Sequence, residues 1–110
     1  DVKGKVANEN LGTSISDAGD VDGDGFGDLV VGAWQNSNGA QSGGCVYLFS
    51  GRDGAELRKW TCKQVGDTFG FDATGIGDVN GDGKIDFLIT SAWSSVRKSK
   101  GGRVFVISGK

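Results

Sequence analysis

Two nine-residue segments, each rich in aspartate and glycine, carry the side chains of this sequence that could do chemistry. The first reads Asp-Val-Asp-Gly-Asp-Gly-Phe-Gly-Asp over residues 20–28, and the second reads Asp-Val-Asn-Gly-Asp-Gly-Lys-Ile-Asp over residues 78–86. Oxygen-bearing side chains occupy positions 1, 3, 5 and 9 of both. Ca²⁺ takes six to eight oxygen ligands, and a tight loop can direct alternate side chains toward one centre. The spacing therefore predicts a calcium site in each segment.

The glycines at positions 4 and 6 permit φ angles that a Cβ atom would oppose, so the backbone can curl around an ion. We expect this curl to direct the carbonyl of position 7 toward the ion, with water completing the shell. Because Asn80 is neutral, the second loop is expected to bind calcium more weakly. We expect two Ca²⁺ per chain, and the predicted ligands are Asp20, Asp22, Asp24, Asp28 and the Phe26 carbonyl in the first loop, and Asp78, Asn80, Asp82, Asp86 and the Lys84 carbonyl in the second.

Competing interpretations of these loops are weaker. An EF-hand begins with the same residues but requires a bidentate glutamate at position 12, where this sequence has Val31 and Ile89. Mg²⁺ is less suited than Ca²⁺ to a cage made almost wholly of protein oxygens. A single such loop could also be an ordinary Asx-Gly turn between strands. Recurrence of the same ligand spacing favours the metal site.

Composition limits the class of protein. The chain has 110 residues, 21 glycines and no proline, which indicates one domain or less, made of short strands and tight turns. Seven of its 14 acidic residues lie in the two loops, although its net charge is only −2. Such crowding costs free energy unless a cation compensates it.

Several functions are not expected. The chain contains no histidine, no serine-centred nucleophile motif and no carboxylate pair outside the loops, so we do not expect an enzyme. No apolar run approaches the ~20 residues of a membrane-spanning helix, and membrane insertion and nucleic-acid partners are not expected.

The two loops belong to an internal repeat. Subtracting 20 from 78 gives an offset of 58, and other segments coincide at this offset: Leu11-Gly12 with Phe69-Gly70, Asp28-Leu29 with Asp86-Phe87, and Val46–Gly51 with Val104–Gly109. Between them, Gly32-Ala33-Trp34 matches Ser91-Ala92-Trp93, a slip of one residue. Repeats of this length indicate one structural unit each.

Short runs rich in β-formers and bounded by turn residues predict an all-β fold with four strands per repeat and no helix. We place the first repeat at about residues 9–66 and the second at about 67–110. The second stops after its third strand, whereas residues 1–8 form a displaced strand that precedes the first. The predicted strands are Thr13–Ala18, Leu29–Val31, Cys45–Phe49 and Glu56–Trp60, then Asp72–Ile76, Phe87–Ile89 and Arg103–Ile107.

The order of these motifs resembles the FG-GAP repeat, the blade unit of integrin α-subunit β-propellers. The motif stands here as Leu11-Gly12 and Gly32-Ala33-Trp34 in the first copy, and as Phe69-Gly70 and Ser91-Ala92-Trp93 in the second. The resemblance implies β-propeller blades of four-stranded antiparallel sheets, with about two blades in this chain. Neither tripeptide has the proline of the family pattern, so the turn after that strand is expected to differ from that of the family.

Family propellers usually have about seven blades, and a propeller needs a closed ring because each blade buries a face on the next. The ring is therefore expected to be completed by homo-oligomerisation, as a trimer or a tetramer, unless the chain is a fragment. In such an assembly, Val2–Ala7 of one copy could complete the second blade of its neighbour.

The resemblance implies a calcium-binding, non-catalytic module for extracellular adhesion or recognition, with mainly structural calcium. Millimolar extracellular calcium suits sites of modest affinity, so we expect a secreted or cell-surface location and a protein or glycan ligand. One alternative is a carbohydrate-binding lectin, with Trp34, Trp93 and Tyr47 either as stacking platforms or as core residues. Another is an excised or engineered propeller fragment that self-assembles without a ligand of its own.

The two cysteines leave two alternatives open, a disulfide or two free buried thiols. If the hairpin turn pairs Ser50 with Ala55, then Cys45 lies opposite Trp60 and diagonal to Cys62. A bridge would then need only a slight bulge in the strand.

Overall fold

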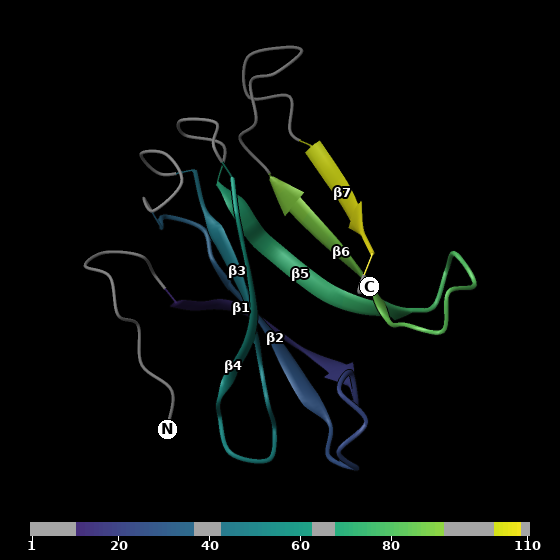
Figure 1. Ribbon diagram of the computed structural model, residues 1–110. Coiled ribbons are helices and arrows are strands. Elements are labelled where there is room, and N and C mark those ends of the chain that lie inside the picture. The colour runs from purple at the N-terminus through teal and green to yellow at the C-terminus, as the bar shows by residue number, and fades with distance from the viewer. Residues whose placement is uncertain (1–10, 37–42, 63–67, 92–102, 109–110) are drawn as a thin grey trace.

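The computed structural model describes residues 11–36, 43–62, 68–91 and 103–108, which form two antiparallel sheets (Figure 1). The all-β prediction is confirmed for these residues, and each of the seven strands expected there is present. No helix long and apolar enough to cross a membrane occurs in this part of the chain. The first sheet has the order β1 (Leu11–Gly19), β2 (Asp28–Ala33), β3 (Cys45–Phe49), β4 (Glu56–Thr61), and the second has β5 (Phe69–Gly77), β6 (Asp86–Ser91), β7 (Arg103–Ile107).

Strand pairing shows that both sheets follow one plan. Ile15 pairs with Val31 in the first sheet, and Ala73 pairs with Ile89 in the second, each 58 residues later. At the ends of these strands, Leu11 pairs with Ala33 and Phe69 pairs with Ser91. Ala33 is therefore equivalent to Ser91, and the predicted one-residue slip at Gly32-Ala33-Trp34 is wrong as far as β6 extends. Residue similarity alone suggests the slip, whereas the hydrogen-bond register between paired strands determines which residues are equivalent.

The first strands of the two sheets, β1 and β5, approach each other through equivalent positions. The hydroxyl groups of Ser16 and Thr74, which are 58 residues apart, share a hydrogen bond of 3.0 Å. Ser14 Oγ donates to the carbonyl oxygen of Gly70 at 3.4 Å. A Cβ atom on Gly32 would overlap that same carbonyl, so glycine is needed there for the close approach. Contact between equivalent first strands is expected of neighbouring blades around a common axis.

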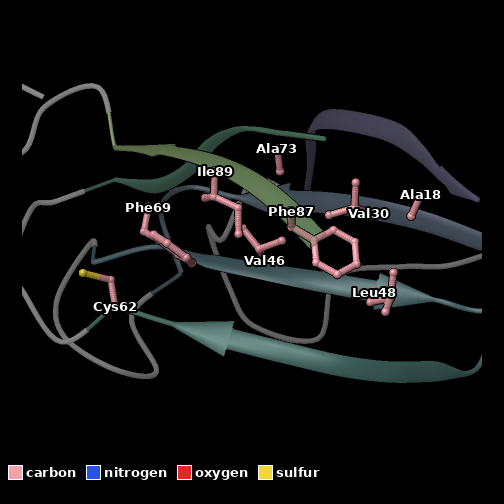
Figure 2. Close-up of a cluster of buried hydrophobic side chains, with 9 residues drawn as sticks. All are labelled: Ala18, Val30, Val46, Leu48, Cys62, Phe69, Ala73, Phe87 and Ile89. Atoms are coloured by element: carbon pink, nitrogen blue, oxygen red, sulfur yellow. The ribbon is translucent and has the colours of Figure 1, made fainter. Parts of the chain in front are cut away.

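The main hydrophobic core lies between the two sheets (Figure 2). Its aromatic contacts include Trp60 with Phe87, with ring centroids 5.1 Å apart, and Phe69 with Phe105, at 5.0 Å. A smaller cluster covers the opposite face of the first sheet. The main core contains Ala18, Val30, Val46, Leu48 and Cys62 from the first-sheet segment, and Phe69, Ala73, Phe87 and Ile89 from the second.

The β3–β4 hairpin corrects one expectation. Its turn pairs Ser50 with Ala55 as predicted, through a 2.8 Å bond between Ser50 N and Ala55 O. A register shift between Leu48 and Phe49 then places Cys45 opposite Thr61 rather than Trp60. Cys45 consequently belongs to the outer cluster and Cys62 to the inter-sheet core, and both are buried and form no disulfide. The structure favours the free-thiol alternative.

The predicted strand at Val2–Ala7 and the second tripeptide's Ala92-Trp93 lie outside the described residues. Among the described residues, the first sheet has four strands and the second has three.

Candidate metal centre

Each acidic loop connects the first two strands of its sheet and is organised by its first aspartate. In the first loop, Asp20 Oδ1 accepts hydrogen bonds from the amides of Gly23, at 2.8 Å, and Asp24, at 3.0 Å. Asp20 Oδ2 accepts from the amide of Gly25 at 2.8 Å. Three backbone donors thus hold one carboxylate at the centre of the loop. Because Gly23 and Gly25 have φ angles of 77° and 86°, the predicted need for glycine at positions 4 and 6 is confirmed there.

The second loop repeats this arrangement. Asp78 Oδ1 accepts from the amides of Gly81, at 2.7 Å, and Asp82, at 3.1 Å, while Asp78 Oδ2 accepts from Gly83 at 2.8 Å. Gly81 and Gly83 have φ angles of 77° and 82°. The two loops therefore share the hydrogen bonds that determine their shape as well as their residue types.

Positions 3 and 5 also correspond between the loops. Asp22 Oδ1 accepts from the amide of Asp24 at 3.2 Å, and Asn80 Oδ1 accepts from the amide of Asp82 at the same distance. At position 5, Asp24 Oδ1 accepts from the Phe26 amide at 2.9 Å. Asp82 Oδ1 accepts from the Lys84 amide, also at 2.9 Å. The Asn80 side chain therefore occupies the place of a carboxylate without changing the loop.

The aspartates at position 9 anchor the loops to the sheets. Asp28 and Asp86 are the buried members, with 0% and 1% of their surfaces exposed. Asp28 Oδ2 accepts from the Val21 amide at 2.9 Å, and Asp86 Oδ2 accepts from the Val79 amide at 2.9 Å. Buried carboxylates require such donors, since burial without them costs several kcal/mol. Each loop is thus closed by a bond from position 2 to position 9.

Two supporting residues were missed by the sequence reasoning. The amide of Gly51 donates to Asp28 Oδ1 at 3.0 Å, which joins the first loop to the β3–β4 turn. Ser108 Oγ donates to Asp82 Oδ2 at 3.2 Å and joins the second loop to the end of β7. The sequence contained a signal for both, because Ser50-Gly51 recurs as Ser108-Gly109 at the offset of 58.

The structure brings together three carboxylates in each loop. Oxygen atoms of Asp20, Asp22 and Asp28 lie within 4.8 Å of one another, and so do those of Asp78, Asp82 and Asp86. Asp24 is not part of the first group, and position 3 of the second loop is the neutral Asn80, whose Oδ1 accepts from the Asp82 amide. The expected contributions of the Phe26 and Lys84 carbonyls stay predictions. Three carboxylates around one centre are hard, anionic oxygen donors, and this donor set fits Ca²⁺.

In the first loop, the pKa values of Asp20 and Asp22 are shifted in opposite directions. The bond from the Gly25 amide, with those from Gly23 and Asp24, lowers the pKa of Asp20 below its ordinary 3.8, although partial desolvation opposes the change. Desolvation is the largest cause that raises the pKa of Asp22, and the neighbouring charges of Asp24 and Asp28 raise it further. Asp20 is thus a firmly ionised centre, whereas the ionised form of Asp22 is destabilised by its crowded position. A bound cation would relieve that cost.

Comparison with known proteins gives an independent finding. Residues 12–49, which include the whole first loop, β2 and β3, match the family model described as FG-GAP repeat. The chain is 35% identical over 99 residues to integrin alpha-PS2 of Drosophila melanogaster, which covers 80% of this chain and 7% of that protein. It is 33% identical over 94 residues to integrin alpha-2 of Mus musculus, covering 76% and 8% respectively. It is 33% identical over 87 residues to integrin alpha-5 of Xenopus laevis, and this match covers 72% of this chain and 8% of that protein.

The resemblance to FG-GAP repeats is therefore confirmed, and the chain spans less than a tenth of the length of these curated relatives.

Proposed function

Because residues 12–49 form an FG-GAP repeat and most of the chain is similar to integrin alpha subunits, we propose that it is a calcium-stabilised, non-catalytic propeller segment for adhesion or recognition outside the cell. The observation that carries this proposal is the repeated hydrogen-bonded loop that gathers three carboxylates in each sheet. The proposed ligands are the ten residues predicted from the sequence, one Ca²⁺ to each loop.

The contacts of the loops support a structural role for the ion. Asp28 already accepts amide bonds on both oxygens, from Val21 and Gly51, so its remaining lone pairs would join the ion to the sheet. A cation there would hold the β1–β2 connection and the β3–β4 turn together. Loops filled with protein ligands leave little open coordination for a substrate, which favours a non-catalytic ion. Millimolar extracellular calcium would saturate such sites even at modest affinity.

Thermal unfolding tests the proposal. The melting temperature of the protein should rise saturably with calcium and fall back when a chelator is added, because the ion binds only the folded loops. Asp20→Asn and Asp78→Asn should each remove part of this rise, since each replaces the carboxylate at the centre of one loop. Glu56→Gln is the matched control, because it removes one exposed negative charge from β4 outside both loops.

Two results would overturn the proposal. One is a melting temperature that does not change with calcium, and the other is a loss of the calcium-dependent rise in the control variant as complete as in the loop variants. Magnesium at the same concentration should raise the melting temperature less, since its smaller octahedral shell fits these loops poorly.

The lectin alternative depends on exposed aromatic rings, and the candidate residues differ in how exposed they are. Tyr47 is only 5% exposed; its ring stacks on Phe49 with centroids 5.5 Å apart, and its hydroxyl accepts a hydrogen bond from Asn36. Trp34 is half-buried and packs edge-on against Phe71, which is 40% exposed. Of the three aromatic residues named for this alternative, Trp34 remains a candidate platform, because Trp93 lies outside the described residues. A glycan array that stays blank at high protein concentration would dismiss the alternative, and binding lost in Trp34→Ala would support it.

A further inference from the structure

The two acidic loops approach each other where the sheets meet, and one apolar side chain lies between them. Ile85 occupies position 8 of the second loop, where the first loop has Gly27. We propose that Ile85 couples the two calcium sites, so that calcium bound in either loop tightens binding in the other. This inference rests on the proposed function, because it requires both loops to bind calcium, and it adds an interaction between the two sites.

The Ile85 side chain reaches from the second loop to the beginning of the first. A Cβ atom placed on Gly19 would lie only 3.1 Å from Ile85 Cδ1, so these two residues are closely packed. Gly19 directly precedes Asp20, the carboxylate at the centre of the first loop. In the second loop, Ile85 stands between two predicted ligands, the Lys84 carbonyl and Asp86. One side chain thus joins the ligand-bearing segments of both loops.

A second apolar residue belongs to this contact from the side of the first loop. Val21 stands between Asp20 and Asp22 in the sequence, and both Val21 and Ile85 are partly buried against the main core. The same two residues line one groove of about 350 Å³, whose walls come from both sheets. Val79, the equivalent of Val21 in the second loop, is instead 58% exposed. The apolar contact therefore joins position 2 of the first loop to position 8 of the second.

The strands that lead into the loops are also held together beside this contact. The hydroxyl groups of Ser16 and Thr74 share their hydrogen bond one turn of chain before the loops begin. Closer to the loops, a Cβ atom on Gly75 would lie 3.0 Å from Ala18 Cα, so the two backbones themselves are in close approach. One loop entrance therefore has little room to shift without the other.

Coupling between the sites follows from the cost of ordering them. Calcium fixes the loop that holds it, and this costs conformational entropy. An ion in the first loop would fix Gly19 and Val21, against which Ile85 packs, so part of the ordering needed by the second ion would already be complete.

Repulsion between the two ions opposes this effect, but it is weakened by distance and by salt. Packed sheets lie about 10 Å apart, and physiological salt screens exposed charges over about 8 Å. We expect the second loop to bind calcium about fivefold more tightly when the first is occupied, and the reciprocal effect must be equal.

Calorimetric calcium titration tests the coupling in the unchanged protein, in Asp20→Asn, in Ile85→Ala and in the double variant. Asp20→Asn lowers the occupancy of the first loop, because it removes the central carboxylate there. The calcium affinity of the second loop should then fall about fivefold, although none of its own ligands has changed. In the Ile85→Ala background, the same substitution should change that affinity less than about twofold, because the coupling is already lost.

Val79→Ala is the matched control, because Val79 occupies the position of Val21 but is largely exposed. The fivefold effect of Asp20→Asn should persist in Val79→Ala. Val21→Ala shortens the other side of the contact and should reduce the effect as Ile85→Ala does. This second variant keeps the test decisive if Ile85→Ala folds poorly.

Hydrogen exchange gives an independent measurement of the same coupling. The amides of Gly81 and Gly83 donate to Asp78 inside the second loop. At a calcium concentration that fills only the first loop, their exchange should slow in the unchanged protein but not in Ile85→Ala.

The outcomes separate this inference from the proposed function. If Asp20→Asn left the second loop's affinity unchanged or raised it, the coupling would be overturned while calcium binding itself stood. A fivefold effect that persisted in both Ile85→Ala and Val21→Ala would equally overturn the role of this contact. Absence of calcium binding at both loops of the unchanged protein would overturn both proposals.

Discussion

Replacing Asn80 with aspartate should tighten calcium binding at the second loop. Asn80 Oδ1 accepts the Asp82 amide at 3.2 Å, and Asp22 Oδ1 accepts the Asp24 amide at the same distance in the first loop. An aspartate at position 80 would therefore find the hydrogen bond that already holds its equivalent. The substitution adds one negative charge and leaves the shape of the loop unchanged.

The size of the effect follows from electrostatics. Two unit charges ~4 Å apart interact by about 1 kcal/mol in water, so a divalent ion gains about 2 kcal/mol from one added carboxylate. Asn80 is exposed, so the dielectric of water is the appropriate choice. Salt reduces this gain, whereas relief of repulsion from Asp78 and Asp82 on binding increases it. We expect calcium to bind the second loop about tenfold to thirtyfold more tightly in Asn80→Asp.

Calorimetric calcium titration is the assay. The unchanged protein should show a tighter and a weaker event, and in Asn80→Asp the weaker event should move toward the tighter one. Asp22→Asn is the reciprocal control and should weaken the tighter event. Asp24→Ala should remove the tighter event, and Asp82→Ala the weaker. If Asn80→Asp left the weaker event unchanged, or if Asp82→Ala removed the tighter one, the reasoning from loop charge would be refuted.

Three further predictions follow from the supporting contacts. Gly51→Ala should lower stability by about 1–3 kcal/mol, measured by thermal unfolding, because its Cβ atom would overlap the carbonyl oxygen of Gly27; an unchanged melting temperature would contradict this close approach. Calcium affinity at the first loop should fall as the pH is lowered through the raised pKa of Asp22, since protons then compete with the ion; affinity that does not change across this range would exclude Asp22 as a ligand. Cys45 and Cys62 should react with a thiol reagent only after denaturation, and a reductant should leave the melting temperature unchanged; a disulfide in the purified protein would contradict the observed register.

Much of the fold could be predicted because its signals are local and repeated. Turn residues and short β-rich runs mark every described strand, and the offset of 58 extends from one copy to the other. The hairpin register was harder, because the Ser50–Ala55 turn alone predicts that Cys45 faces Trp60. The irregularity beside Leu48 shifts the partner of Cys45 to Thr61, and no turn residue in the sequence indicates it.

The hydrogen bonds within each acidic loop could also be predicted from the sequence. The contacts that join a loop to the rest of its sheet were harder to predict. Positive φ angles at Gly23 and Gly25 and bonds to Asp20 arise within six residues, where spacing determines contact. The bond from Gly51 to Asp28 joins residues 23 positions apart and depends on the packing of the hairpin. It could have been inferred only from the recurrence of a Ser-Gly pair in both repeats.

A crystal structure grown in millimolar calcium, with an anomalous difference map, tests the central claim most directly. The account predicts one calcium peak in each loop, with oxygen ligands at about 2.3–2.6 Å that include Asp20 and Asp28 in the first and Asp78 and Asp86 in the second. Loops that keep the hydrogen bonds described above but show no peak at either centre would contradict it, and the two segments would then be turns between strands.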